Sequence, residues 1–230
     1  LKTVMDFSFF DKINTAKNEE TDTWFKGLDR VYNNFVYDYL YPDPASVLAF
    51  IENHDTDRFL GEGENLDMLK QASTLLLTTR RIPQLYYGTE VMMNGVKSKS
   101  DGYVRKDFPG GWANDKENAL TPEGRTKLQN ESYNFYRNLL NWRKGNDVIA
   151  KGSMKQFMVQ HGVYAYAREY NGKTVFVLLN GTDKEVKLPL KYYAEVLKDK
   201  TQGKDVISGK MIMLNEELTM APRQSMVIEL

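Results

Sequence analysis

The densest run of polar side chains in this sequence is Glu52-Asn53-His54-Asp55-Thr56-Asp57-Arg58, which directly follows the apolar residues 47–51. Polar residues at the carboxyl end of a buried parallel strand lie where α/β folds place their active sites. Carboxylates and an imidazole at such a position can bind hydroxyl groups or transfer protons. The run is equally compatible with a solvated strand-to-helix loop, in which Asp57 and Arg58 pair with each other or cap the next helix.

Three other kinds of site find little support in the same run. Zinc binding requires a spacing such as HExxH, which is absent, and the only other histidine is His161, in a turn between predicted strands. A calcium loop that began at Asp55 would have Phe59 at its fifth position, where an oxygen ligand is needed. Glu52 and Asp55 are three residues apart in extended chain, so their side chains should diverge rather than form an acid/base pair.

The first half of the chain predicts strands that alternate with amphipathic helices. Three short apolar runs are typical of buried strands, at residues 4–7, 47–51 and 82–87. Three stretches have apolar residues at helical spacing, residues 28–40, 66–76 and 128–142, the last after the start signal Thr121-Pro122-Glu123. Such repetition predicts parallel strands with right-handed crossovers. Three units fit either a doubly wound sheet or part of a (β/α)8 barrel.

From Val148 onward the pattern predicts short β-strands and no further helices. The strands are expected at residues 163–170, 174–179, 185–188, 205–207, 211–214 and 225–230. Asn171-Gly172 between the first two is a strong hairpin signal. The fold class is therefore α/β plus β, with an α/β domain over residues 1–146 and a small antiparallel β-sandwich over residues 147–230.

Composition excludes several classes of function. The 31 basic and 31 acidic residues give a net charge of +0, and no basic block is present, so nucleic acid is not an expected partner. Apolar runs do not exceed five residues, which predicts no membrane span. The absence of cysteine excludes disulfides, thiolate metal sites and cysteine nucleophiles. Aromatic residues make up 12%, which suits a protein that presents flat surfaces to a ligand, although a core alone could account for them.

Several motifs resemble those of the alpha-amylase family of glycoside hydrolases. Phe50-Ile-Glu-Asn-His-Asp-Thr-Asp-Arg58 resembles the family's FxxNHD strand-end motif, and Ile82-Pro-Gln-Leu-Tyr-Tyr-Gly-Thr-Glu90 resembles its eighth barrel strand. Val4-Met5-Asp6-Phe7 is similar to the sixth strand, and the tail after Val148 is similar to the β-sandwich that follows the barrel. The resemblance covers nearly the whole chain in the family's order. It implies the C-terminal part of a (β/α)8 TIM barrel, with strands six to eight, followed by an antiparallel β-sandwich domain.

The resemblance also implies roles for individual residues. Asp55 matches the transition-state-stabilising carboxylate of the family, and His54 matches a residue that hydrogen-bonds the same sugar. An anion near the ring supports an oxocarbenium-like transition state. Asn53 fits a positioning role. Tyr86 and Tyr87 end a buried strand, so one of them is expected to belong to the core and the other to face the sugar, and Tyr86 is the candidate for the sugar contact.

A second sugar subsite is implied further along the chain. Asp101-Gly-Tyr-Val-Arg105 is similar to the Asp/Arg pair that binds the next sugar in the cyclomaltodextrinase and neopullulanase branch. Lys106-Asp-Phe-Pro-Gly-Gly-Trp112 resembles a segment of periplasmic neopullulanases. We expect Asn53, His54, Asp55, Asp101 and Arg105 to lie together at the carboxyl ends of the strands.

The family's nucleophile and acid/base follow its fourth and fifth strands, which find no match in this chain. The chain alone is therefore expected to be an inactive part of a retaining glycosidase that acts on starch-like α-glucans. The missing barrel half, or self-association, is expected to cover its open edge. Alternatives are an alpha-glucosidase, isomerase or transglycosylase of the family, or a non-catalytic glucan-binding or structural module. No cofactor is required, the sequence does not support calcium, and the resemblance implies a periplasmic or extracellular location.

Overall fold

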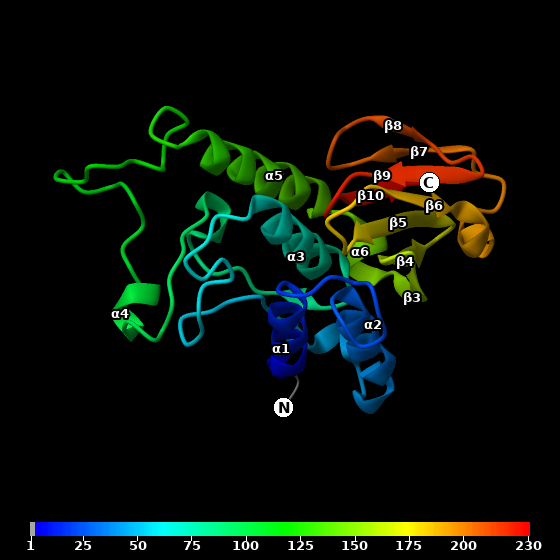
Figure 1. Ribbon diagram of the computed structural model, residues 1–230, viewed down its shortest axis with the longest axis horizontal. Helices are drawn as coiled ribbons and strands as arrows, with labels where there is room; N and C mark the ends of the chain where they lie inside the picture. The colour runs from blue at the N-terminus through cyan, green and yellow to red at the C-terminus, as the bar shows by residue number, and fades with distance from the viewer. Residues whose placement is uncertain (1–2) are drawn as a thin grey trace.

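The computed structural model describes residues 3–230, which form a mixed helix and strand region followed by an antiparallel β region (Figure 1). The first region contains α1 (Phe7–Ala16), α2 (Leu28–Val36), β1 (Leu48–Ala49), α3 (Leu66–Thr78), β2 (Ile82–Pro83), α4 (Asp101–Val104) and α5 (Lys127–Arg143). The second contains α6 (Asp147–Lys151), β3 (Ser153–Gln160), β4 (Val163–Tyr170), β5 (Lys173–Asn180), β6 (Val186–Pro189), α7 (Ala194–Leu197), β7 (Gln202–Asp205), β8 (Met211–Met213), β9 (Glu217–Met220) and β10 (Ser225–Glu229).

The parallel arrangement predicted for the first region is confirmed, although its regular pairing is short. Met5 forms a parallel bridge with Leu48, and β1 pairs in parallel with β2, with Leu48 opposite Ile82. The strand expected at residues 4–7 is wrong beyond that bridge, because α1 already begins at Phe7. The Asp6 side chain caps this helix by accepting a 2.8 Å hydrogen bond from the backbone N–H of Phe9.

The predicted helices are confirmed with altered ends. The helix expected over residues 28–40 ends at Val36 and continues as a 3₁₀ turn, Tyr37–Leu40, whose Tyr39 and Leu40 are exposed rather than buried. Helix α5 begins after Thr126 instead of at residues 121–123. There Thr126 and Gln129 form a reciprocal capping box, which satisfies two backbone N–H groups that would otherwise have no partner in the helix.

The second region is built on one large antiparallel sheet in the order β3-β4-β5-β10-β7-β8, and β6 pairs with β9 in a separate small sheet. The Asn171-Gly172 hairpin is confirmed, and both residues have positive φ, at 47° and 74°. The expectation of no helices from Val148 onward is wrong, since α6 begins at Asp147, with Asn146 as its cap, and continues to Lys151, and α7 follows β6. Strands β3 and β9 were not predicted either.

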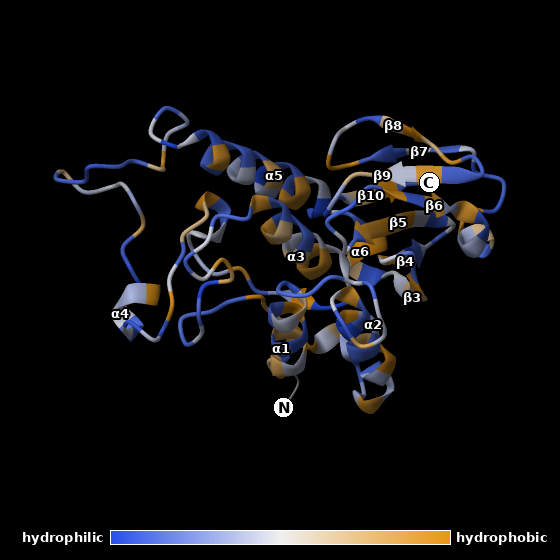
Figure 2. Ribbon diagram, in the orientation of Figure 1, coloured by the Kyte–Doolittle hydropathy of each residue, from blue (hydrophilic) through white to orange (hydrophobic). Residues whose placement is uncertain are grey.

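The central strands β4, β5 and β10 of the large sheet are buried on both faces. One face packs against β6, β9 and α7 through side chains such as Phe176, Leu178 and Tyr193, which is the expected sandwich with a small second layer. The other face carries Tyr164 and Tyr166 toward the helices of the first region. In Figure 2, β5 is mostly apolar, whereas α3 and α5 show both apolar and polar residues, as expected for amphipathic helices.

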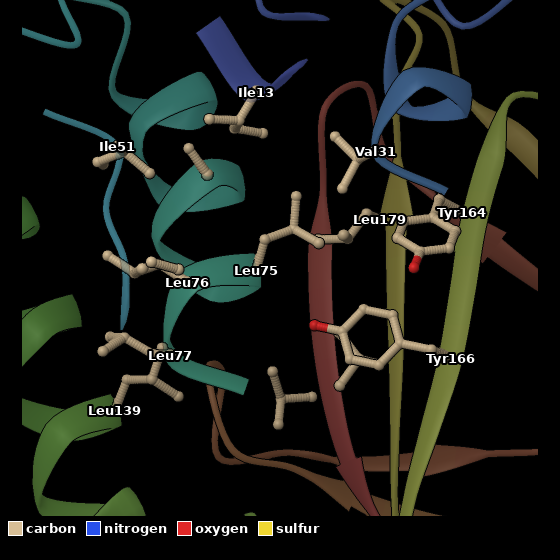
Figure 3. Packing of buried hydrophobic residues seen from close by; sticks show 14 of the residues in the cluster. Ile13, Val31, Ile51, Leu75, Leu76, Leu77, Leu139, Tyr164, Tyr166 and Leu179 are labelled. Atoms are coloured by element: carbon tan, nitrogen blue, oxygen red, sulfur yellow. The ribbon is translucent and has the colours of Figure 1, made fainter. Parts of the chain in front are cut away.

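Helix α3 lies between the parallel strands and the large sheet, so one hydrophobic core joins the two regions (Figure 3). Leu76 points toward Ile51, and Leu75 points toward Leu179 of β5 (Figure 3). Polar contacts cross the same boundary, since the buried Arg168 donates a 2.8 Å hydrogen bond to the carbonyl of Thr78 at the end of α3. The strand ends are therefore positioned by helices that are themselves fixed against the β-sheet.

Candidate functional site

The polar loop after β1 is held in a defined turn by Asn53. This side chain is buried, and its Oδ1 accepts a 2.8 Å hydrogen bond from the backbone N–H of Asp55. The backbone N–H of Asn53 in turn donates to Thr56 Oγ1 at 2.9 Å. These bonds leave the Asp55 side chain 60% exposed, next to the equally exposed His54. Asn53 thus positions the loop rather than presenting its amide to solvent.

Three of the predicted site residues, His54, Asp55 and Asp101, meet around the guanidinium of a fourth, Arg105. Its Nη2 lies 2.9 Å from Asp55 Oδ1 and 3.1 Å from Asp101 Oδ2. Its Nε donates a 2.8 Å hydrogen bond to the carbonyl of His54, and His54 Nε2 lies 3.2 Å from Asp55 Oδ2. We call His54, Asp55, Asp101 and Arg105 the strand-end cluster. The structure brings these four together from the loop after β1, from α4 and from Arg105 directly after α4, whereas their roles toward a sugar stay predictions.

Lys97 is a member of this neighbourhood that sequence reasoning missed. Its Nζ donates a 3.0 Å hydrogen bond to the carbonyl of Asp55 and lies 3.3 Å from Asp101 Oδ1. Its backbone N–H donates to Asp57 Oδ1 at 2.6 Å. The i, i+4 spacing of Lys97 and Asp101 was the available signal. Together with Arg105 it balances the charge of the two carboxylates in the strand-end cluster.

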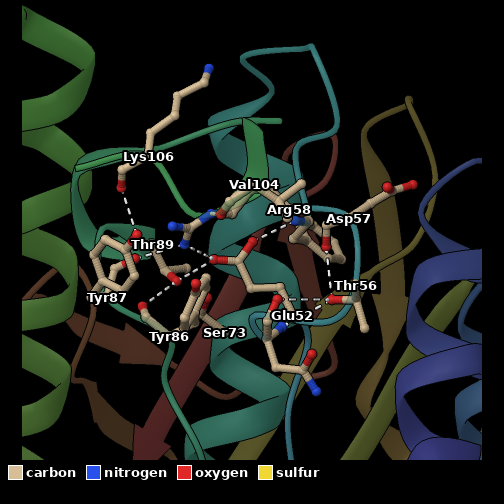
Figure 4. Close-up of polar contacts among 12 residues, drawn as sticks. Glu52, Thr56, Asp57, Arg58, Ser73, Tyr86, Tyr87, Thr89, Val104 and Lys106 are labelled. Carbon is tan, nitrogen blue, oxygen red and sulfur yellow. Dashed lines mark hydrogen bonds and ion pairs between the residues drawn. The ribbon is translucent and has the colours of Figure 1, made fainter. Parts of the chain in front are cut away.

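A buried ion pair lies beneath the cluster. Arg58 and Glu52 are both at most 2% exposed, with Arg58 Nη1 3.2 Å from Glu52 Oε1 (Figure 4). Glu52 also accepts hydrogen bonds from the Thr89 hydroxyl and the backbone N–H of Phe59. The proposed pairing of Asp57 with Arg58 is therefore wrong, because the Arg58 side chain is buried and pairs with the Glu52 carboxylate.

The Arg58 guanidinium also connects the loops that surround the strand ends. It donates hydrogen bonds to the carbonyl of Tyr87 at 2.6 Å and to that of Val104 at 3.1 Å, directly before Arg105 (Figure 4). Burial raises the pKa of Glu52, while hydrogen bonds from Thr89 and Phe59 and the charge of Arg58 act against that rise. Arg58 thus fixes the loop after β1, which carries His54 and Asp55, against the segment that carries Arg105.

Tyr86 lies over this buried pair. Its ring centroid is 4.0 Å from the Arg58 guanidinium carbon, and its ring packs edge-on against Tyr87 at 4.7 Å. Burial raises the pKa of the half-buried Tyr86 hydroxyl. The Tyr87 hydroxyl donates to the carbonyl of Lys106 (Figure 4). Tyr86 therefore stabilises Arg58 by a cation–π contact, and its predicted contact with a sugar is a separate expectation.

Among residues 3–230, no three His, Asp or Glu side chains are grouped so that they could hold a metal ion. The expectation about calcium therefore stays a prediction from the sequence. In the same part of the chain, no helix combines the length and the apolar character needed to cross a membrane.

The strand-end cluster offers acceptors and donors of fixed orientation to solvent. Two carboxylates, one guanidinium and one imidazole can together bind neighbouring hydroxyls of a sugar ring. Glu52 cannot take part in surface chemistry, because it is enclosed by Arg58 and Thr89. Chemically, the arrangement can bind and orient a polyhydroxylated ligand and place one anion, Asp55, beside it.

Comparisons with known proteins agree with this organisation. Residues 154–229 match a family described as the cyclo-malto-dextrinase C-terminal domain. An alpha-amylase of Niallia circulans is 28% identical over 220 residues, covering 92% of this chain and 38% of that protein. A cyclomaltodextrin glucanotransferase of Thermoanaerobacterium thermosulfurigenes is 31% identical over 177 residues, covering 77% of this chain and 22% of that protein. The chain thus spans between about a fifth and two fifths of these relatives.

Solved structures share the fold over the whole chain. An alpha-amylase of Geobacillus thermoleovorans, determined in complex with acarbose, has a TM-score of 0.77 at 18% identity and covers 100% of this chain and 48% of its own. The structure of AmyP in complex with maltose has a TM-score of 0.73 at 16% identity and covers 100% of this chain and 50% of its own. At these identities the likeness concerns the fold alone.

Proposed function

This chain belongs to the alpha-amylase family and corresponds to its C-terminal part, and on that premise we propose that it carries the sugar-positioning residues of a retaining glycosidase. The substrates are starch-like α-glucans, such as starch-derived oligosaccharides, pullulan or cyclodextrins. The observation that carries the proposal is the strand-end cluster, in which Asp55 is held beside His54 and Arg105 at the carboxyl ends of the strands.

In this proposal each member of the cluster has one task. Asp55 accepts hydrogen bonds from ring hydroxyls, and these strengthen as positive charge develops on the sugar in the transition state. His54 donates to the same sugar, and Asn53 holds the turn that orients Asp55. Asp101 and Arg105 bind the next sugar along the chain, where a guanidinium and a carboxylate suit neighbouring hydroxyls.

The nucleophile and the acid/base of the reaction lie outside these 230 residues in the proposed scheme. Retaining glycosidases need two carboxyl groups roughly 5 Å apart, and Asp55 alone cannot supply both. We therefore expect the isolated chain to be inactive. Its Val4 and Met5, beside the open edge of the parallel strands, and Phe7 at the start of α1 are exposed, which supports a further barrel half, or a second copy of the chain, as their cover. The chemistry uses carboxylates and needs no cofactor.

The test is the exchange of Asp55 for asparagine in the whole protein. Asp55→Asn preserves the shape of the side chain but removes the anion, so kcat on maltooligosaccharides should fall by roughly 10²-fold or more, with KM little changed. Asp199→Asn, an exposed aspartate in the β region, is the matched control and should leave kcat unchanged. A kcat of Asp55→Asn within about threefold of the wild type would contradict the proposal.

Transfer of the glucan chain to another sugar, in place of hydrolysis, is the second candidate function, and several relatives of the chain favour it. Several of them, at 27–31% identity, are cyclomaltodextrin glucanotransferases. Product analysis of a starch digest separates the two, because transfer within one chain yields cyclic glucans and hydrolysis yields linear reducing oligosaccharides. A digest with linear products alone would reject this candidate.

A further inference from the structure

Asp55 and Asp101 share one cation in the strand-end cluster, although the proposed function gives them to two different sugars. Asp55 Oδ1 and Asp101 Oδ2 lie 2.9 and 3.1 Å from the same atom, Arg105 Nη2. Two carboxylates that approach one nitrogen repel each other, and a single guanidinium leaves the group with a net negative charge. A second cation is therefore needed to keep both carboxylates in place.

Lys97 supplies this second cation. Its Nζ lies 3.3 Å from Asp101 Oδ1, so Asp101 has a cation on each of its two carboxylate oxygens. Contacts on both oxygens fix the orientation of a carboxylate. The same Nζ donates a 3.0 Å hydrogen bond to the backbone carbonyl of Asp55, which ties Asp101 to the loop after β1. The Lys97 side chain is 39% exposed, so it lies at the surface where a ligand would bind.

The backbone beside Lys97 is fixed against the loop after β1. The carbonyl of Gly95 accepts a 2.9 Å hydrogen bond from the N–H of Arg58, and the N–H of Gly95 donates one of 2.6 Å to the carbonyl of Gly61. A Cβ atom at Gly95 would lie 2.8 Å from the carbonyl oxygen of Tyr103, so glycine allows this segment to pass close to α4. Lys97 therefore starts from a backbone of defined position, and its ammonium group is preorganised.

We propose that Lys97 is a positioning residue of the reaction, which orients Asp101 toward the sugar next to the one held by Asp55. It acts through Asp101 and takes no part in bond cleavage. Without Lys97, the Asp101 carboxylate can turn toward Arg105 and compete with Asp55 for the guanidinium. The second sugar then loses its orientation, while Asp55 keeps the turn that Asn53 holds. This role rests on the proposed function, because it requires that Asp101 binds a sugar.

Two substrates that differ by one glucose unit test this role in the whole protein. Release of nitrophenol is measured from 4-nitrophenyl α-glucoside and from 4-nitrophenyl α-maltoside, and the second glucose should raise kcat/KM of the wild type. Lys97→Met keeps the length of the side chain but removes its charge. It should lower kcat/KM on the maltoside about tenfold, mostly through a higher KM, and on the glucoside by no more than about threefold.

Two further lysine variants separate the charge at this position from a general effect of the substitution. Lys97→Arg restores a cation with several donors and should recover most of the loss on the maltoside. Lys187→Met, at an exposed lysine on β6, is the matched control and should equal the wild type on both substrates. The Tm of Lys97→Met should stay within about 4 °C of the wild type, because half-exposed ion pairs contribute little to stability.

The double variant Lys97→Met/Asp101→Asn separates a positioning role from a structural one. If Lys97 acts through Asp101, the double variant should have the same kcat/KM on the maltoside as Asp101→Asn alone. Losses that multiply, equal losses on both substrates, a larger fall in Tm, or a wild type that gains nothing from the second glucose would each overturn the role. The turnover of Asp55→Asn on the glucoside decides the proposed function separately, since the Lys97 variants are compared with Asp55 intact.

Discussion

Replacement of Arg58 by methionine tests how the site is held together. Arg58 is fully buried and donates hydrogen bonds to Glu52 and to the carbonyls of Tyr87 and Val104. Methionine has a similar length but no charge, so Arg58→Met leaves the Glu52 carboxylate buried without its cation. Removal of one partner of a buried pair typically costs about 3–5 kcal/mol.

The expected change in the free energy of unfolding of Arg58→Met follows from two opposing contributions. The unpaired carboxylate and two carbonyls that lose their donor destabilise the native state by about 4–5 kcal/mol. The buried methionine side chain regains about 1.5 kcal/mol through its apolar surface. We therefore expect the free energy of unfolding to fall by about 3 kcal/mol. For a chain of this length, that corresponds to a decrease in Tm of about 6–12 °C.

Urea unfolding followed by circular dichroism measures this change. The double variant Glu52→Gln/Arg58→Met removes the unpaired charge, so it should be more stable than Arg58→Met by about 1.5 kcal/mol. Arg137→Met, an exposed arginine on α5, is the control and should lie within about 0.5 kcal/mol of the wild type. A loss below 1 kcal/mol for Arg58→Met, or a double variant less stable than Arg58→Met alone, would refute the reasoning.

Three further stability predictions concern groups away from the site. Glu19 accepts two 2.7 Å hydrogen bonds from Arg30, which lower the pKa of Glu19 to about 2. The pair therefore stabilises the fold above about pH 4.5 and loses this effect as the pH falls toward 2. When stability is measured against pH in acid, Glu19→Gln should remove about 1–2 kcal/mol of the pH dependence, which is less than the full pKa shift implies because the pair is partly solvated. Gly172→Ala forces an alanine to a φ of 74° and should cost about 1 kcal/mol in urea unfolding, whereas no loss would mean that the turn relaxes. Thr126→Ala breaks the capping box with Gln129 and should cost about 1 kcal/mol, with hydrogen exchange faster only in the first turn of α5 if the cap acts locally.

The sequence was sufficient for the order and type of most elements, because their patterns are local. Continuous runs of β-branched and aromatic residues on either side of the Asn171-Gly172 turn define β4 and β5, and helical spacing defines α3 and α5. Helix α1 was missed although Asp6 and the spacing of Phe9 and Ile13 were available signals, since the run of phenylalanines also suits a strand. Strand β3 was missed because it is an edge strand with polar residues on much of its length.

The candidate site was likewise predicted from the sequence only in part. The sequence placed Asp55 and Asp101 near one face, since loops that follow parallel strands emerge at the same end of the sheet. It did not predict that Arg58 turns inward to Glu52, nor that Lys97 joins Asp101. The contacts of Arg58 depend on how three separate loops pack together, since its partners Glu52, Tyr87 and Val104 are 6, 29 and 46 positions away. Local patterns contain no information about these contacts, whereas the i, i+4 spacing of Lys97 and Asp101 is a local signal.

A structure of the protein with a bound maltooligosaccharide would show directly whether the strand-end cluster binds sugar. One glucose ring should lie within hydrogen-bond distance of both His54 and Asp55, and the next ring should contact Asp101 and Arg105. Clear density for the oligosaccharide with no ring in contact with Asp55 would contradict this prediction.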